Sequence, residues 1–247
     1  MDKNSVFFSQ LPSELNVDSP VEERLLAEYG AMFVARGVNL PDRIVFRNDA
    51  DVSEFQSKVR RSSEIIDGVE IELQAAALED LRNALLVAEG LGLSITPRGR
   101  DSARRTYSET VELWKSRVEP GLSHWLAEGK LTEAEADRIR SLSPFEQVSV
   151  VLELEENGLY FAKDLSKSII YSVAPPGTSQ HLSMLALDVA EFDDKDVRAL
   201  LIEHKWFQTV VSDLPHFTYL GVREDELADL GLKKVLSCGR TFWLPDV

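Results

Sequence analysis

Apolar residues in the N-terminal third of the chain recur at the spacing of α-helices. Over residues 21–37 they share one helical face, and Asp18 or Ser19 can cap the start of that helix. The same reasoning predicts a helix over about 51–61 and a longer one over about 69–91. Gly90 and Gly92 then end the third helix.

The pattern changes twice further along. LSITP at 93–97 predicts a short strand, and helical spacing then returns from about Tyr107 to Asn157. After Gly158, β-branched and aromatic runs predict strands, with one helix over 193–205 between them. The predicted strands are 168–174, 185–192, 206–211, 216–222 and 240–244.

Helices early and strands late favour an α+β fold, in which helices back one side of a small, mainly antiparallel sheet. We expect a helical N-terminal region over residues 1–92 and a second region over 93–247, together forming one compact unit. Hydrophobic residues make up 44% of the 247 residues and charged residues 28%, which is the balance of a folded globular protein.

Charge narrows the range of partners. The formal net charge is −15, so the surface repels phosphate backbones, and nucleic acid is not an expected partner. No apolar run is long enough for a membrane span. The N-terminal segment lacks the features of a secretory signal. Cys238 is the single cysteine, so it indicates neither an oxidising nor a reducing environment. The sequence therefore does not identify the cellular compartment.

Two histidines and one aspartate are candidate metal ligands. His181 lies in a turn that leads towards Asp188, and His216 opens a later strand. Two imidazoles and a carboxylate suit Zn²⁺, and a catalytic zinc site keeps its fourth position for water. The spacing alone is weakly specific, so a loop position for the histidines and backbone hydrogen bonding for Asp188 remain alternatives.

The segment SQHLSMLALD resembles the S-x-H-x-x-G-x-A-x-D motif of the VanY-type D-alanyl-D-alanine carboxypeptidase family. The Ser, His, Ala and Asp of that motif fall on Ser179, His181, Ala186 and Asp188. Met184 stands where the motif has glycine. This resemblance implies that His181 and Asp188 bind one zinc ion.

The later segment DLPHFTY resembles the E-x-W-H-x-x-Y segment of the same family. The metal-binding histidine falls on His216 and the terminal aromatic on Tyr219. Asp213 stands at the place of the catalytic acid, one methylene shorter than glutamate, and Pro215 replaces the tryptophan. The two motifs occur in the family's order, and they imply a zinc site with a general acid/base at Asp213; a turn cap before Pro215 is the alternative for Asp213.

A fainter match places the family's arginine on Arg100, with Arg98 as a competitor because the residues usual before the arginine are absent. The resemblance implies that Arg100 stabilises an oxyanion or binds a substrate carboxylate, with Arg98 and Ser179 as further substrate-binding candidates. Pairing with the acidic surface is the alternative for Arg100. The match covers roughly residues 93–222, which makes 93–247 the peptidase core of a Hedgehog/DD-peptidase-like fold.

The resemblance therefore implies a zinc metallopeptidase that acts on peptidoglycan stem peptides, most simply at the terminal D-alanyl-D-alanine bond. L,D-carboxypeptidase and endopeptidase specificities stay open. The rival from another class is a non-catalytic metal- or peptidoglycan-binding protein, which the departures at Met184, Gly99 and Pro215 motivate; a structural protein with incidental histidines is a third alternative. An enzyme of this family would work in the cell envelope, if a leader had been removed.

Overall fold

The computed structural model describes residues 4–247, so the first three residues of the predicted region 1–92 lie outside it. The chain forms two compact units. The first consists of residues up to Ile44, Ser53–Arg105 and Gln180–Val247, and the second of Val45–Val52 and Thr106–Ser179. Each unit draws on both of the predicted ranges.

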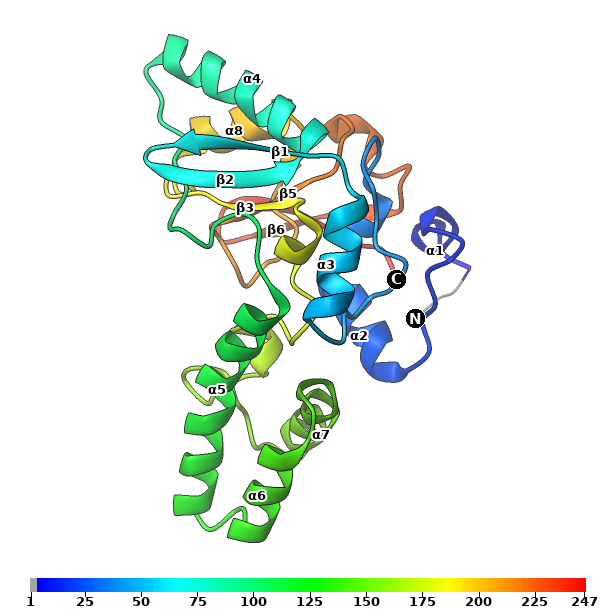
Figure 1. The fold of residues 1–247 in the computed structure, drawn as a ribbon, viewed down its shortest axis with the longest axis vertical. Helices are drawn as coiled ribbons and strands as arrows, with labels where there is room; N and C mark the ends of the chain where they lie inside the picture. Colours follow the sequence, from blue (N-terminus) through cyan, green and yellow to red (C-terminus); the bar gives the residue numbers. More distant parts are fainter. Residues whose placement is uncertain (1–3) are drawn as a thin grey trace. The chain divides into compact units, whose positions relative to one another are not determined.

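The first unit mixes helices with short strands (Figure 1). Its helices, with 3₁₀ turns labelled η, are α1 (Val6–Gln10), α2 (Pro20–Tyr29), η1 (Gly30–Val34), α4 (Ala75–Leu91), η3 (Gln180–Ser183), α8 (Lys195–Glu203) and η4 (Glu224–Glu226). Its strands are β1 (Arg61–Ile66), β2 (Val69–Gln74), β3 (Ala186–Asp188), β4 (Trp206–Phe207), β5 (His216–Tyr219), β6 (Leu232–Ser237) and β7 (Arg240–Pro245). This combination confirms the predicted α+β class.

Three antiparallel sheets form, and the central one has the strand order β3-β5-β4. A hydrophobic core joins one face of this sheet to α4 and α8, and Leu187, Phe217 and Tyr219 point into it. Side chains alternate between the faces of a strand, so Asp188 and His216 lie on the opposite face. In the register of the sheet these two residues are direct partners.

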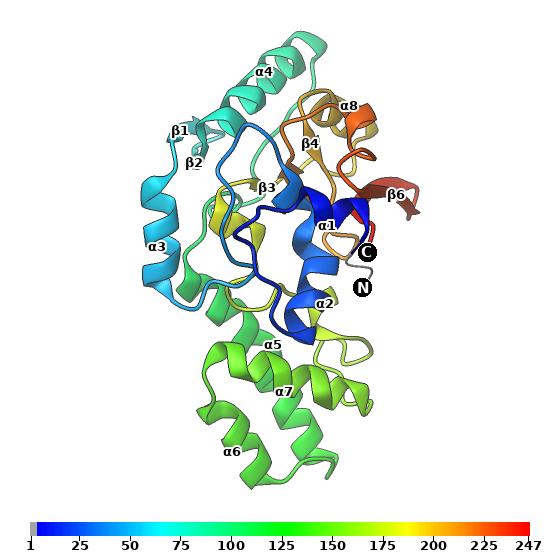
Figure 2. The ribbon, with the colours of Figure 1, turned by 90° about the vertical axis from the view of Figure 1, so that its right-hand side faces the viewer.

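The second unit is helical (Figure 2). It holds α5 (Tyr107–Ala127), α6 (Glu133–Ser141), α7 (Pro144–Glu156) and η2 (Ile169–Tyr171), while α3 (Asp49–Lys58) begins in this unit and ends in the first. Thr106 and Thr132 start α5 and α6 with capping boxes, in which the hydroxyl accepts from the backbone three residues on. The helical character predicted up to about residue 157 is confirmed.

The predicted helix over 69–91 is wrong in its first turn and a half. Residues 69–74 form β2, which pairs with β1 in a hairpin, and α4 starts only at Ala75. Asp67 and Gly68 both have positive φ, 47° and 75°, at the two turn positions. This Asp-Gly pair is the turn that joins antiparallel strands most readily, so the hairpin prevails over helical periodicity.

Two predicted strands do not form. Residues 168–174 make the single turn η2, because the Ile169 amide donates to the buried Glu155 carboxylate at 2.6 Å and its carbonyl accepts from Ser172 and Val173. Residues 93–97 form only an isolated bridge, between Pro97 and Val189. The remaining predicted strands all occur, and β3, β4 and β5 are shorter than expected. Within residues 4–247 no helix has the length and apolar character that crossing a membrane requires.

Candidate metal centre

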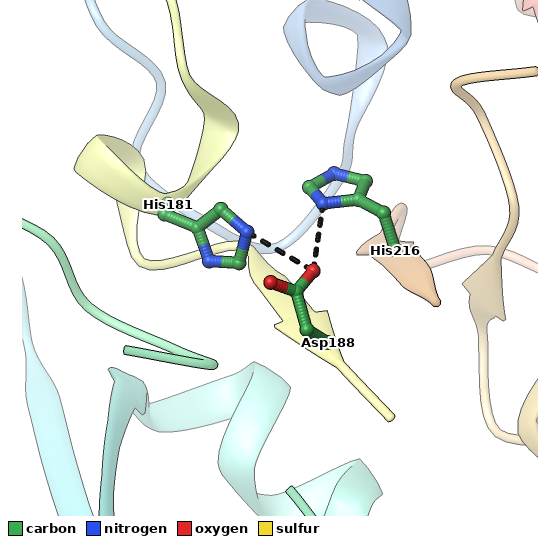
Figure 3. Close-up of side chains that lie close together, drawn as sticks. All are labelled: His181, Asp188 and His216. Carbon is green, nitrogen blue, oxygen red and sulfur yellow. Dashed lines mark hydrogen bonds and ion pairs between the residues drawn. The ribbon is translucent and has the colours of Figure 1, made fainter. Parts of the chain in front are cut away.

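The three predicted metal ligands come from three elements of the first unit and meet at one point (Figure 3). His181 lies in η3, Asp188 ends β3 and His216 begins β5. One ligand atom from each lies within 4.8 Å of the other two. The sheet register brings Asp188 and His216 together, and η3 adds His181 from the chain that leads into β3.

Met184 makes the turn between η3 and β3. Its φ is +55°, in the left-handed region that favours glycine, and its side chain is fully buried. The family motif has its glycine at this place, which the backbone conformation explains. A non-glycine residue in this conformation costs roughly 1–2 kcal/mol. Here the buried Met184 side chain offsets that strain through its packing.

His181 is almost completely buried, and its ring is held from one side. The Nδ1 atom lies 2.6 Å from the carbonyl oxygen of Ala103. A carbonyl oxygen only accepts, so Nδ1 carries the proton and Nε2 carries a lone pair. That Nε2 lies 3.3 Å from Asp188 Oδ1, and it has no hydrogen-bond partner among the described residues.

His216 faces the same carboxylate oxygen. Its Nδ1 lies 3.2 Å from Asp188 Oδ1, and its Nε2 lies 2.8 Å from the side-chain oxygen of Gln180. The rings of His181 and His216 meet edge to face, with centroids 4.9 Å apart. Both imidazoles thus point one nitrogen at the same oxygen of Asp188.

The two oxygens of Asp188 have different partners. Oδ1 faces the imidazoles, whereas Oδ2 accepts a hydrogen bond of 2.8 Å from the Arg105 guanidinium. Burial on its own would raise the pKa of Asp188, but its interactions with His181 and His216 outweigh burial and hold the pKa well below its ordinary value. Burial lowers the pKa of His181, against the opposing effect of Asp188. An ionised carboxylate and a neutral imidazole are the states that metal binding requires.

These residues fit a metal ion. The unprotonated, buried His181 Nε2 and the carboxylate oxygen that it faces both carry lone pairs and no proton between them. A cation bound between these two atoms would satisfy both of them. Two nitrogens and one oxygen form a ligand set of the kind found in zinc sites with an open fourth position. The cluster of His181, Asp188 and His216 can therefore hold a metal ion.

The other candidate residues lie outside this cluster. Arg98 and Arg100 are exposed, and the Arg98 guanidinium lies 6.0 Å from the centre of the Phe192 ring. Asp213 is exposed in the turn before β5, where its carbonyl accepts from the His216 amide at 3.2 Å. Ser179 is buried and belongs to the second unit. The roles of these four residues stay predictions.

Two residues that contact the ligands are absent from the sequence-based set. Arg105 reaches Asp188 from the loop before α5, and Gln180 reaches His216 from η3. Arg105 is one of four arginines between positions 98 and 105, so the sequence indicates the loop but not the residue. Gln180 occupies an unspecified position of the first motif, where its type carries no signal.

No protein-family model matches the chain, and no curated protein matches it. Among solved structures, the chain is similar to a mutant of the vancomycin-resistance D,D-pentapeptidase VanY from a VanB-type resistance cassette, in complex with Zn(II). The TM-score is 0.37 and the identity 17%, over 67% of this chain and 82% of that chain. It is similar at the same TM-score and identity to VanYB in complex with D-alanine-D-alanine, over 67% of this chain and 80% of that chain. Both are VanY enzymes, as the two sequence motifs had indicated.

Proposed function

We propose that this chain is a zinc-dependent peptidase that cleaves cell-wall peptides. One observation carries the proposal: His181 Nε2 is buried, unprotonated and directed at Asp188 Oδ1, with His216 Nδ1 beside it. A ligand set of two imidazoles and one carboxylate is used for hydrolysis by zinc enzymes. The two sequence motifs that contain these residues resemble those of a peptidase family, which supports peptide hydrolysis as the reaction.

Bound zinc supplies Lewis acidity, which polarises a carbonyl group and makes water a better nucleophile at neutral pH. Asp213 accepts a proton from the attacking water and delivers it to the leaving amine. Its exposed position three residues before His216 supports this role, because the turn that presents it is hydrogen-bonded to the first residue of β5.

Three arginines of the loop divide the remaining work. Arg105 holds Asp188 Oδ2, which leaves Oδ1 for the metal. Arg100, with Arg98 beside it, is exposed and available to bind the carboxylate of a peptide or a developing oxyanion, to which a guanidinium is suited. Ser179 is the further substrate-binding candidate.

The substrate that we propose is a peptidoglycan stem peptide cleaved at its terminal D-alanyl-D-alanine bond. The motifs support this choice, and D-alanine-D-alanine is the ligand seen with VanYB. The test is release of D-alanine from a stem pentapeptide by zinc-loaded protein, with His181→Ala as the inactive control. Mass spectrometry of the products identifies L,D-carboxypeptidase or endopeptidase cleavage. Either result would refute the proposed D-alanyl-D-alanine bond as the cleavage site and would still support a zinc-dependent peptidase.

A second candidate is a binding protein that keeps the metal but has no turnover. Two departures from the family motif favour it: Asp213 is shorter than the family's glutamate, and Pro215 stands in place of tryptophan. Wild-type protein that contains one zinc per chain and cleaves no cell-wall peptide would establish this candidate. Peptide binding measured by calorimetry would then identify its ligand.

A further inference from the structure

We propose that Gln180 sets the tautomer of His216 and so aims the Nδ1 lone pair of that ring at the metal. Gln180 is a positioning residue, since it contacts a ligand and not the metal. The inference rests on the proposed function only in expecting a metal at this site. The hydrogen bonds of the protein itself carry the rest.

The orientation of the Gln180 amide is fixed by its nitrogen. The side chain is almost fully buried, and its Nε2 donates to the carbonyl oxygen of Tyr29 at 2.8 Å. Because that carbonyl can only accept, the amide nitrogen must lie on this side. The amide oxygen of Gln180 therefore faces His216.

A ring of hydrogen bonds with two threonines is satisfied in this orientation of the amide. Gln180 Nε2 lies 3.4 Å from Thr209 Oγ1, and Thr209 Oγ1 lies 2.7 Å from Thr218 Oγ1. Thr218 in turn donates to the oxygen of Gln180. Each hydroxyl donates once and accepts once, so the ring could run in either direction. With the amide nitrogen placed by the Tyr29 carbonyl, it runs from Gln180 Nε2 through Thr209 and Thr218 back to the Gln180 oxygen.

The tautomer of His216 follows from this orientation. The amide oxygen of Gln180 is an acceptor only, so His216 Nε2, 2.8 Å away, must carry a proton. In the neutral ring Nδ1 then has the lone pair, and it points at Asp188 Oδ1. The carbonyl of Ala103 fixes the other tautomer in His181, where Nδ1 carries the proton and Nε2 has the lone pair.

The position of Gln180 in the chain gives this contact a second role. Gln180 directly precedes one ligand, His181, and holds the other, His216. His216 and Thr218 lie on the same face of β5, two residues apart, so a single side chain contacts both. A hydrogen bond to the far nitrogen of a ligating histidine typically contributes 10–100-fold, roughly, to metal affinity.

The test compares two variants with wild type. Gln180→Met has nearly the same length and no acceptor, whereas Gln180→Glu keeps an oxygen at the place of Oε1. Gln147→Met is the matched control, because Gln147 is a buried glutamine with two hydrogen bonds, to Trp114 and Ile139, and none to a ligand. The readouts are the zinc Kd by chelator competition and the imidazole ¹⁵N shifts of metal-free protein.

In the neutral ring of metal-free wild type, we expect His216 to show a protonated Nε2 and an unprotonated Nδ1. Gln180→Met should mix the tautomers and raise the zinc Kd by about 10–100-fold. Gln180→Glu should keep the tautomer and lose less affinity, and Gln147→Met should bind zinc as wild type does.

Wild-type His216 with its proton on Nδ1, or equal zinc Kd values for Gln180→Met and wild type, would overturn the inference. If Gln180→Met does not fold, the spectrum of wild type and the behaviour of Gln180→Glu decide the question. If wild type binds no zinc at all, the proposed function fails, and the ¹⁵N shifts of the metal-free protein still test Gln180.

Discussion

The metal cluster and the residues proposed to act on the substrate differ sharply in their surroundings. His181 and His216 are buried, and each ring has a partner for its outer nitrogen. Arg100 and Asp213 are exposed. Buried polar groups have their geometry fixed by obligatory hydrogen bonds, whereas exposed side chains move between rotamers in water.

This difference separates metal binding from turnover. The geometry of the candidate metal cluster is fixed by hydrogen bonds inside the first unit, whereas the groups proposed to move protons are exposed to solvent. Substitutions in the cluster should therefore affect zinc and activity together. Substitutions at the surface should affect activity alone.

The largest effect is expected from Asp188→Ala. It removes a ligand and leaves the Arg105 guanidinium, 14% exposed, without its closest carboxylate. Zinc binding should be lost, and the free energy of unfolding of metal-free protein should fall by about 3 kcal/mol, as when one partner of a buried ion pair is removed. Zinc content and urea unfolding measure the two effects.

Asp101→Ala is the matched control for this change. Asp101 lies 3.6 Å from the same guanidinium but is largely exposed, so its removal should change stability little. Equal destabilisation by both variants would show that the Arg105–Asp188 contact is not special.

Asp213→Ala should lower kcat by about 10²–10⁴-fold, the range for loss of a general acid/base. Zinc content should stay at the wild-type level, because no cluster contact involves the Asp213 side chain among the residues described. Asp229→Ala, at another exposed aspartate, is the control. A parallel loss of zinc would contradict the separation of metal binding from turnover.

The arginines of the loop should also separate into one that affects metal binding and one that affects only turnover. Arg105→Ala frees Asp188 Oδ2 and should weaken zinc binding by about tenfold, as loss of a group that orients a ligand does. Arg100→Ala should leave the zinc Kd unchanged and raise KM for the peptide. If Arg105→Ala changed KM alone, Arg105 would be the substrate-binding arginine.

Met184→Gly should have a smaller effect, with two terms of opposite sign. Glycine relieves roughly 1–2 kcal/mol of backbone strain at φ +55°. It also removes a fully buried side chain, which costs about 2–5 kcal/mol by analogy with truncation to alanine. We expect a net loss of stability in thermal unfolding, and a stabilised variant would show that packing at Met184 is poor.

The smallest effect concerns pH. Burial lowers the pKa of His181 from its ordinary value of 6.5, so the unfolded chain takes up this proton at a higher pH than the folded one. Stability of metal-free protein should therefore fall as pH decreases below 6.5 and level off below the folded pKa. Asp188 stays ionised through this window, because its folded pKa lies well below its ordinary value. Urea unfolding should show a smaller pH dependence for His181→Gln than for wild type, and equal slopes would contradict the shift.

The sequence indicates the three residues that meet in the cluster more directly than it indicates the fold around them. His181, Asp188 and His216 follow from two motifs, yet only the pairing of β3 with β5 brings them together, and spacing cannot give such a long-range register. The Asp67–Gly68 pair is a local signal for a hairpin, and it favours a strand rather than a helix for residues 69–74, which follow it.

Other features could not be read at all. The turn η2 forms where a strand was predicted because Glu155, near the end of the preceding helix α7, accepts the Ile169 amide. Arg105 and Gln180 differ from neighbouring polar residues only in what they touch. Tertiary contacts, rather than local preference, decide both cases.

The ion pair between Arg105 and Asp188 also has a consequence for the field around the site. A divalent ion in the cluster, together with the Arg105 guanidinium, would outweigh the single Asp188 carboxylate, so the metal-loaded cluster would be positive in a chain with a formal charge of −15. On the proposed function, a peptide that ends in a free carboxylate would be attracted to this positive charge and repelled by the acidic surface elsewhere, so it would approach the cluster by its carboxyl end.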